Sequence, residues 1–260
     1  MADNNVAVEV AKAVYEDAGH EIIQPTGKTL SLIPRAVRAA LQPLEKWIMV
    51  REYNLEEFRK ILDYKLEHVE PEKIVSPEPY VAVPALQAVT YCMDNAELRN
   101  MYANLLAKSM NEATKDGVHP AYVEIIKQLC PDEAKMMRYM MENPQLPSLS
   151  VRVYKSDRSG FIYILKHFSD ITELADCEKI DGFAYYLDNL IRLGLIRIPE
   201  DEHFVNSEKY EPLKQHPRIV QLIDHFQGKY AEYPNVDLDK QIIMLTDFGK
   251  QFCNICIADK

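Results

Sequence analysis

Hydrophobic residues recur at spacings of three and four through the first half of the chain, a pattern typical of amphipathic helices. Asn54 with Glu57, and Asp94 with Glu97, have the spacing of capping pairs and are expected to begin two of these helices. Pro84 is placed to open another. Helices are thus predicted over residues 4–18, 28–48, 54–70, from 84 onward, and over 95–113, 119–129 and 130–143. Together they predict a helical domain over residues 1–145.

The pattern changes after the proline- and serine-bearing stretch 142–150, which is expected to be a link. Residues 149–154, "LSVRVY", alternate like a strand, and a helix over 181–194 is expected to stop at Gly194 and lead into a short apolar strand. A helix containing "PRIVQLIDHF", the strand "QIIML" (241–245) and a final helix capped by Thr246 follow. This order predicts a winged-helix-like α+β domain over residues 146–260. The fold class expected is therefore mainly α with a smaller α+β part.

Composition places the chain among globular proteins, with 47% hydrophobic and 27% charged residues. The net charge of −10 makes nucleic acid a disfavoured partner, because it repels polyanions on average. The first residues have no basic and apolar segments of a secretory signal, and the most apolar stretch, 80–93, is too short to span a membrane. Together with five cysteines, an odd number, this predicts a cytoplasmic protein with reduced thiols.

Two short motifs raise candidate chemistry. Gly27-Lys28-Thr29 resembles the end of a phosphate-binding loop, but the position of the loop's first glycine is Ile22, so Gly27 is interpreted as a turn residue. Cys253 and Cys256 form C-x-x-C within an expected helix, where small buried apolar residues are the better interpretation. The seven histidines show no metal-binding spacing. We therefore assign no catalytic residue, cofactor or metal ligand, and the question of enzyme activity stays open, leaning against it.

Several separated blocks carry a family resemblance. They are "GKTLSLIPRAVRAALQPLEKW" (27–47), "IVSPEPYVAVPALQAV" (74–89), "LRNMYANLLAKSMN" (98–111) and "VHPAYVEIIKQLCPDEAKMMRYM" (118–140), with "LIRLGLI" and "LTDFGKQF" in the second half. On these blocks the chain resembles the abortive-infection alpha family of bacterial phage-defence proteins, chiefly over residues 27–141. One departure is Cys130, where the family more often has serine, a better helix cap than a thiol.

The resemblance implies a role in limiting phage spread by halting growth of the infected cell or killing it. It implies no reaction and no cofactor. We expect the protein to act through a phage or host protein partner, with self-association left open. The candidate contact residues are Tyr80, Pro84, His119, Tyr122, Tyr185, Tyr186 and Arg192.

Two alternatives remain at this stage. The winged-helix-like domain could bind DNA as a transcriptional regulator, although Asp181 and Asp188 beside Arg192 make the helix over 181–194 a poor surface for phosphates. The basic amphipathic stretch 28–48, with Trp47 near its end, could instead act on an anionic membrane surface.

Overall fold

The structure is a computed structural model that describes residues 51–230 and 233–259. Within it, Asn54–Lys260 forms one compact unit. The helices expected over 4–18 and 28–48, and the motif Gly27-Lys28-Thr29, lie outside the described residues. The domain boundary expected between residues 145 and 146 stays a prediction.

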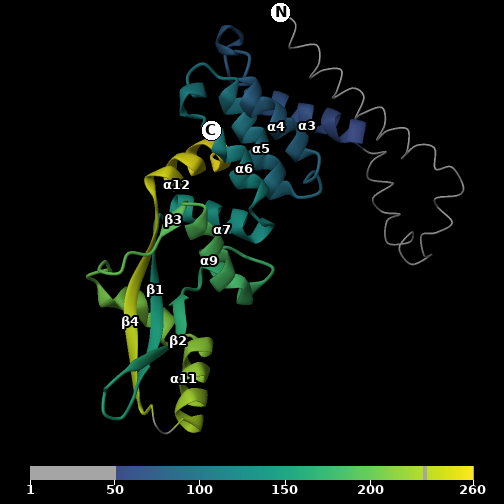
Figure 1. Ribbon diagram of the computed structural model, residues 1–260. Coiled ribbons are helices and arrows are strands. Elements are labelled where there is room, and N and C mark those ends of the chain that lie inside the picture. The colour runs from purple at the N-terminus through teal and green to yellow at the C-terminus, as the bar shows by residue number, and fades with distance from the viewer. Residues whose placement is uncertain (1–50, 231–232, 260) are drawn as a thin grey trace, which may run out of the picture. The chain divides into compact units, whose positions relative to one another are not determined.

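The described chain is mainly helical, as expected, with one four-stranded antiparallel sheet (Figure 1). Its first five helices are α3 (Arg51–Leu66), α4 (Pro79–Val89), α5 (Ala96–Ser109), α6 (Ala121–Lys127) and α7 (Pro131–Glu142). The others are α8 (Ile171–Leu174), α9 (Phe183–Arg192), α10 (Glu211–Lys214), α11 (Pro217–Lys229) and α12 (Asp247–Phe252), which continues into the π-helical turn η6 (Cys253–Ile257). Short 3-10 turns are η2 (Pro71–Lys73), η3 (Lys115–Gly117), η4 (Ile180–Gly182) and η5 (Ser207–Tyr210).

Several helix starts differ from the expected ones. Pro79, and not Pro84, opens α4, because a proline at the first position of a helix loses no hydrogen bond. Pro84 lies inside the helix, where its ring lacks the N–H that would bond the carbonyl of residue 80. Asn54 lies inside α3, so it does not cap that helix. Asn95, one residue after the expected Asp94, caps α5.

The side chain of Asn95 accepts a hydrogen bond of 3.0 Å from the Leu98 N–H, which Asp94 is one residue too early to do. Two other starts are confirmed: α7 begins at Pro131, and Thr246 caps α12 by accepting from the Gly249 N–H at 2.8 Å. Pro131 and Thr246 therefore mark helix starts as expected, whereas the starts expected at Asn54, Pro84 and Asp94 are misplaced by one or more residues.

The sheet has the strand order β2-β1-β4-β3 and consists of β1 (Gln145–Tyr154), β2 (Phe161–Phe168), β3 (Ile196–Arg197) and β4 (Asn235–Leu245). The link expected over 142–150 is wrong, because residues 145–150 are the first part of β1. Pro147 is tolerated there since β2 pairs with β1 only from Leu149 onward, which leaves one edge of β1 unpaired at the proline. Strand β2 was not expected from the sequence at all.

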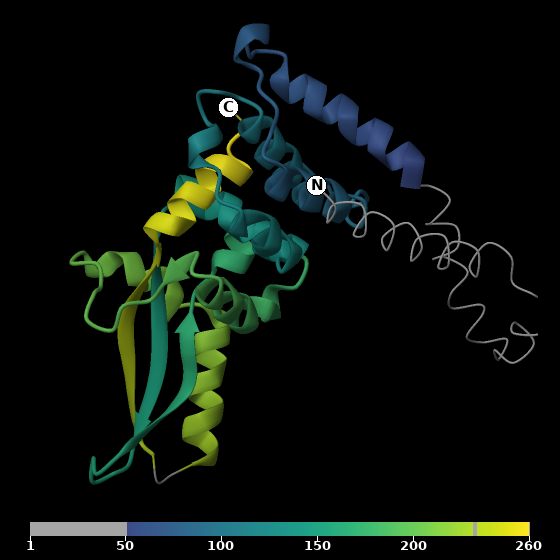
Figure 2. The ribbon, with the colours of Figure 1, turned by 45° about the horizontal axis from the view of Figure 1, so that its top comes forward.

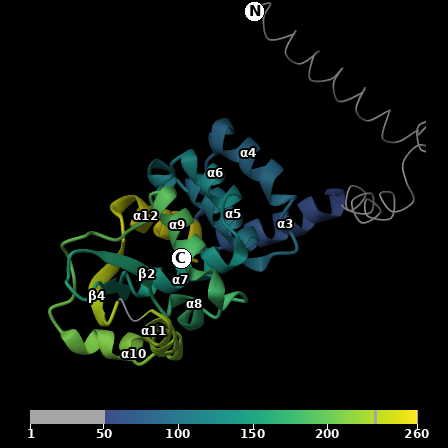
Figure 3. The ribbon, with the colours of Figure 1, turned by 60° about the horizontal axis from the view of Figure 1, so that its bottom comes forward.

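The helical part and the sheet share one continuous core, which runs from Phe58 to Ile257. Figure 1 shows α12 beside α5 and α6 at one end of the long strands, and Figure 2 shows α11 lying along the sheet next to β2. Figure 3 shows α10 and α11 side by side next to the sheet. No helix in the described part of the chain is both long and apolar enough to span a membrane.

Cys253 and Cys256 lie in this core as buried free thiols, which confirms their interpretation as small apolar residues. Burial raises the pKa of the Cys253 thiol to about 12 and raises the pKa of Cys256 as well. Thiolates are the reactive form, so both side chains are inert near neutral pH.

Candidate functional site

Helix α4 turns an apolar face to solvent. Six exposed or half-buried residues, five on one side of α4 and Tyr91 two residues beyond its end, include five apolar side chains and no charged one. These residues are Tyr80, Val83, Pro84, Leu86, Gln87 and Tyr91, and we call them the α4 face. The exposed fractions of Tyr80, Val83, Leu86 and Tyr91 are 61%, 52%, 40% and 67%. The opposite side of the helix, with Val81, Ala85, Ala88 and Val89, is buried in the core.

A groove of about 380 Å³ adjoins this face at the start of α4. It is lined by Val75, Ser76, Glu78, Tyr80, Val81, Ser109, Lys115, Asp116 and Val118. The segment before α4 is held against the end of α5, because the Val75 N–H donates to the Met110 carbonyl at 2.8 Å and Ile74 forms a β-bridge with Asn111. Tyr80 therefore belongs both to the α4 face and to the groove.

Tyr80 and Pro84 of this face are among the contact residues predicted from the sequence, whereas Val83, Leu86, Gln87 and Tyr91 were not predicted. The available indication was that residues 80–93 are apolar on every side of a helix, although only one side can pack on the core. Periodicity does not say which side that is, because an all-round apolar helix has no contrasting polar stripe.

His119 and Tyr122 lie at a different place, where α6 meets α12. The Tyr122 side chain is only 1% exposed, and its ring packs 5.4 Å from the rings of Phe248 and Phe252. His119 is exposed, its ring lies 5.8 Å from that of Phe248, and its Nδ1 accepts from the Ala121 N–H at 3.1 Å. The two residues therefore join α6 to α12, with His119 at the rim.

Tyr185, Tyr186 and Arg192 lie on α9. Tyr185 is exposed, whereas Tyr186 is buried. The Arg192 guanidinium is held by its own helix, since Nη2 donates to Asn189 Oδ1 at 2.6 Å. The seven candidate contact residues thus fall in three separate places, and only the α4 pair belongs to an apolar face.

Asp132 at the start of α7 is the centre of a buried polar cluster. Its carboxylate accepts hydrogen bonds from the Glu178 N–H at 2.8 Å, the Lys179 N–H at 3.0 Å and the Tyr186 hydroxyl at 2.8 Å. Burial alone raises the pKa of this carboxyl, but the three hydrogen bonds outweigh burial and lower it. A charged, fully bonded carboxylate that joins α7 to the loop before α9 has a structural role.

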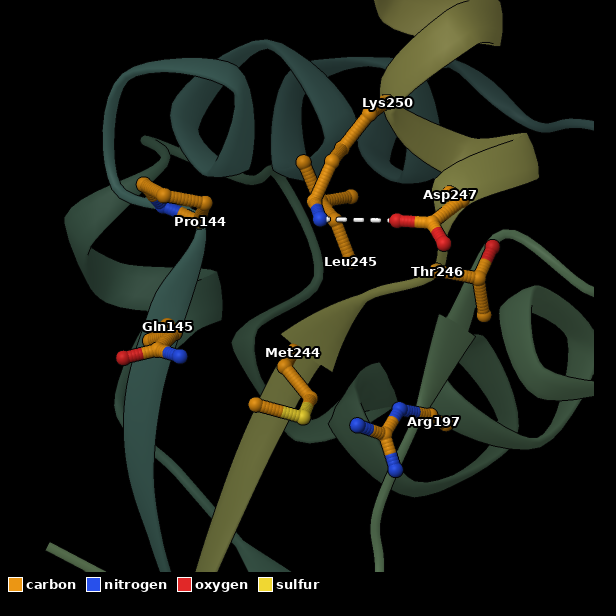
Figure 4. Close-up of a pocket in the computed structure, with 8 residues that line it drawn as sticks. All are labelled: Pro144, Gln145, Arg197, Met244, Leu245, Thr246, Asp247 and Lys250. Carbon is orange, nitrogen blue, oxygen red and sulfur yellow. Dashed lines mark hydrogen bonds and ion pairs between the residues drawn. The ribbon is translucent and has the colours of Figure 1, made fainter.

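A second pocket, of about 480 Å³, lies where three strands end against the start of α12 (Figure 4). It is lined by Pro144, Gln145, Arg197, Met244, Leu245, Thr246, Asp247 and Lys250. Figure 4 shows the Lys250 amine turned toward Asp247, at 2.9 Å, and Arg197 beside Met244. Arg197 pairs with Glu202 at 3.1 Å, so each charged side chain lining this pocket has a partner of opposite charge.

Thr246 in this pocket connects two of the blocks that carried the family resemblance. Its hydroxyl donates to the Gly194 carbonyl at 2.6 Å, and its N–H donates to the Leu195 carbonyl at 3.0 Å. A side chain at Gly249 would place Cβ 1.9 Å from the Leu195 carbonyl oxygen, so only glycine fits there. "LIRLGLI" and "LTDFGKQF" therefore meet in one structural junction. Among residues 51–230 and 233–259, no group of three His, Cys, Asp or Glu side chains could hold a metal ion.

The chain was compared with curated proteins, with solved structures and with protein families. No curated protein matches the chain. A solved structure of an uncharacterized protein from the hydrocarbon-degrading marine bacterium Alcanivorax borkumensis SK2 is similar at 17% identity, covers 56% of this chain and 96% of that one, and has a TM-score of 0.37.

The family described as abortive infection alpha matches residues 50–256, which confirms the resemblance drawn from the sequence. The match contains the α4 face, the Asp132 cluster and the Thr246 junction, while the block 27–47 lies before it. The chain therefore belongs to the abortive infection alpha family.

Proposed function

We propose that this protein acts in abortive infection by binding a phage or host protein through the α4 face. Family membership supports the phage-defence role. The proposed mode of action rests on one observation: the α4 face is exposed, mostly apolar and uncharged, and it lies inside the matched region. Contiguous apolar surface of this kind marks interaction sites in soluble proteins.

The chemistry of the α4 face favours one kind of partner. Tyrosine is enriched at protein interfaces because its ring buries a large apolar area while its hydroxyl stays hydrogen-bonded. The face has no charged residue, so a charged partner surface would lose hydration there without gaining an ion pair. We infer that the partner presents an apolar helix face, which packs along α4 beside the groove, whose lining includes the charged Glu78, Lys115 and Asp116.

The winged-helix-like interpretation supports protein contacts as well. The order α9, β3, β4 and α12 is compatible with such a unit, with α9 in the position of the recognition helix. Arg192 is engaged by Asn189, and Asp188 is exposed on the same helix, which weakens any attraction for DNA phosphates. We therefore infer a protein-contact role for this unit too.

A site-specific photocrosslinker tests the proposal in infected cells. Placed at position 83, it is expected to form a discrete adduct with one partner protein after infection. Placed at position 205, where Val205 is 97% exposed in a loop, it controls for random collision. Equal labelling from both positions would contradict the proposal. A crosslink between two copies of this chain from position 83 would assign the face to self-association and also overturn it.

A further inference from the structure

Strand β2 is a long edge strand with an open side. It pairs with β1 alone, and the opposite edge of the sheet is the much shorter β3. Beyond the ladder, one other described hydrogen bond involves the backbone of residues 163–167, from the His167 N–H to Ser150 Oγ at 3.0 Å, and it also points to β1. The outer N–H and C=O groups of β2 therefore have no partner in the described chain.

An edge of this composition is a strong template for pairing with another strand. Residues 161–165 are aromatic or branched apolar, and Phe161 and Ile162 are 47% and 44% exposed. Proteins normally protect such edges, because unpaired apolar strands lead to aggregation. Helix α11 lies along the sheet next to β2 (Figure 2), and the edge strand itself carries only Lys166 and a bend at His167, where φ is +53°, as protection.

A groove of about 560 Å³ follows this edge. It is lined by Tyr163, Ile164, Leu165, Lys166 and His167 of β2 and by Ala184, Leu187 and Asp188 of α9. Successive side chains of a strand point to opposite faces, so a groove that touches five consecutive residues must run along the strand edge. Helix α9 forms the other wall and lies next to β2 in Figures 1 and 3. An edge strand facing a helix across a groove is the arrangement that receives an extended peptide as an added strand.

The charges around the groove determine which extended peptides it favours. The hairpin of β1 and β2 carries Lys155, Arg158 and Lys166, and none of these three has an ion-pair partner among the described residues. The opposing acids nearby are Asp157 at the turn, Asp188 on α9, and Asp237 and Asp239 on β4, of which the last two are paired with Arg152. In a chain with a net charge of −10, this hairpin is a locally basic element, which favours an acidic segment.

The geometry points to a peptide-binding site: an extended, acidic segment of a partner protein, with apolar residues at alternate positions, adds to the sheet along β2 opposite α9. The bend at His167 limits the paired stretch to about four or five residues. Main-chain hydrogen bonds to the edge give affinity, alternate apolar side chains enter the groove beside Ala184 and Leu187, and acidic side chains approach Lys166. This site is separate from the α4 face and does not depend on its role.

Single-stranded nucleic acid is the less favoured ligand of the same hairpin. The Arg152 guanidinium lies over the Phe161 ring at 5.5 Å from its centroid, and the Tyr154 ring packs 5.4 Å from it, so this ring already has partners within the hairpin. Arg152 also lies over the Tyr163 ring, at 5.9 Å from its centroid, and is paired with Asp237 and Asp239 at 3.0 and 3.2 Å. The charge of Arg152 is therefore already engaged and is not free to pair with a phosphate.

Fluorescence anisotropy with the full chain tests the site directly. The probe is a labelled peptide of about eight residues that alternates glutamate with valine, compared with the same peptide containing lysine for glutamate. The acidic peptide is expected to bind more tightly. Because alternate amides of an added strand face the protein, N-methylation of one alternate set should abolish binding and methylation of the other set should leave it intact. Equal loss from both sets, or from neither, would overturn strand addition.

Two substitutions locate the binding. Ala184→Trp fills the groove from an exposed position of α9, and Lys166→Glu reverses the charge on the strand. Each substitution is expected to weaken the binding of the acidic peptide by about tenfold or more. Their matched controls are Ala113→Trp and Lys60→Glu, at exposed positions outside the groove, and should bind normally. Unchanged affinity in both groove variants would overturn the site. If wild type forms a dimer that Ala184→Trp loses, a second copy of this chain occupies the groove. If a labelled oligothymidylate binds in preference to the acidic peptide, the ligand is nucleic acid. Either result overturns the peptide site.

Discussion

At the scale of single residues, Asp132 shows how a buried charge depends on its hydrogen bonds. Its buried carboxylate is compatible with the fold only because two backbone N–H groups and the Tyr186 hydroxyl all donate to it. Asp132→Asn keeps the shape but places an NH₂ group against donors. We expect a loss of about 2–3 kcal/mol in the free energy of unfolding, measured by urea denaturation at pH 7. Asp224→Asn, at an exposed position of α11, is the matched control and should change little.

The pH dependence of this effect has a defined sign. The folded pKa of Asp132 is lowered, so the stability that its charge contributes is complete above the unfolded pKa of about 3.9 and is lost as the pH falls through the folded value. The difference between wild type and Asp132→Asn should therefore shrink below about pH 4. A difference that grows on acidification would contradict this account.

Thr246 gives a second prediction at this scale. Thr246→Val removes the hydroxyl that accepts from the Gly249 N–H and donates to the Gly194 carbonyl. We expect about 1–2 kcal/mol of destabilisation by thermal or urea unfolding. Thr246→Ser keeps the hydroxyl and should retain most of the stability. Equal losses in both variants would contradict this assignment, because Thr246→Ser keeps the hydroxyl that Thr246→Val lacks.

At the scale of elements, the C-terminal helix is fixed to α5 by a buried amide. Asn104 Nδ2 donates to the carbonyls of Cys256 and Ile257 at 3.1 and 3.2 Å. Asn104→Ala should cost about 1–3 kcal/mol, because it leaves buried carbonyls without a donor. Amide hydrogen exchange in this variant should be faster than in wild type, and the increase should be largest in α12 and η6. Asn100→Ala, one turn earlier on α5, is the control; comparable exchange in both variants would contradict the proposed attachment.

The elements also show what the sequence could predict. Helix ends marked by local chemistry, such as Pro131 and Thr246, follow from the sequence because a cap acts over three residues. Strand β1 was predicted too short, because Pro147 indicates a link unless its pairing on one edge only is known. Strand β2 was missed, although "FIYILKHF" has strand composition, because a strand of mixed exposure lacks clean alternation.

The candidate site was predictable only in part, for a related reason. The sequence identified the α4 stretch through Tyr80 and Pro84, and it placed the buried Tyr122 and Tyr186 in the same category as exposed residues. Which tyrosine faces solvent depends on packing between distant segments, such as Tyr186 on Asp132, and no local pattern contains that information. The groove between β2 and α9 depends on strand order, so it could not be predicted from the sequence either.

At the scale of the whole molecule, the α4 face should contribute to function and little to stability. Val83→Glu adds a charge to an exposed helix position, and Val205→Glu makes the same change in an exposed loop. Both should unfold within about 0.5 kcal/mol of wild type. A large loss in Val83→Glu alone would show that Val83 belongs to the core, contrary to its exposure.

The central claim is that the protein limits phage spread through the α4 face. Culture density over time, after infection at low and high phage dose, tests it most directly in cells that express wild type, Val83→Glu or Val205→Glu. We predict that cultures with wild type and Val205→Glu survive a low dose and collapse at a high dose, whereas Val83→Glu cultures collapse at both. Survival of Val83→Glu cultures at low dose, equal to wild type, would contradict the account.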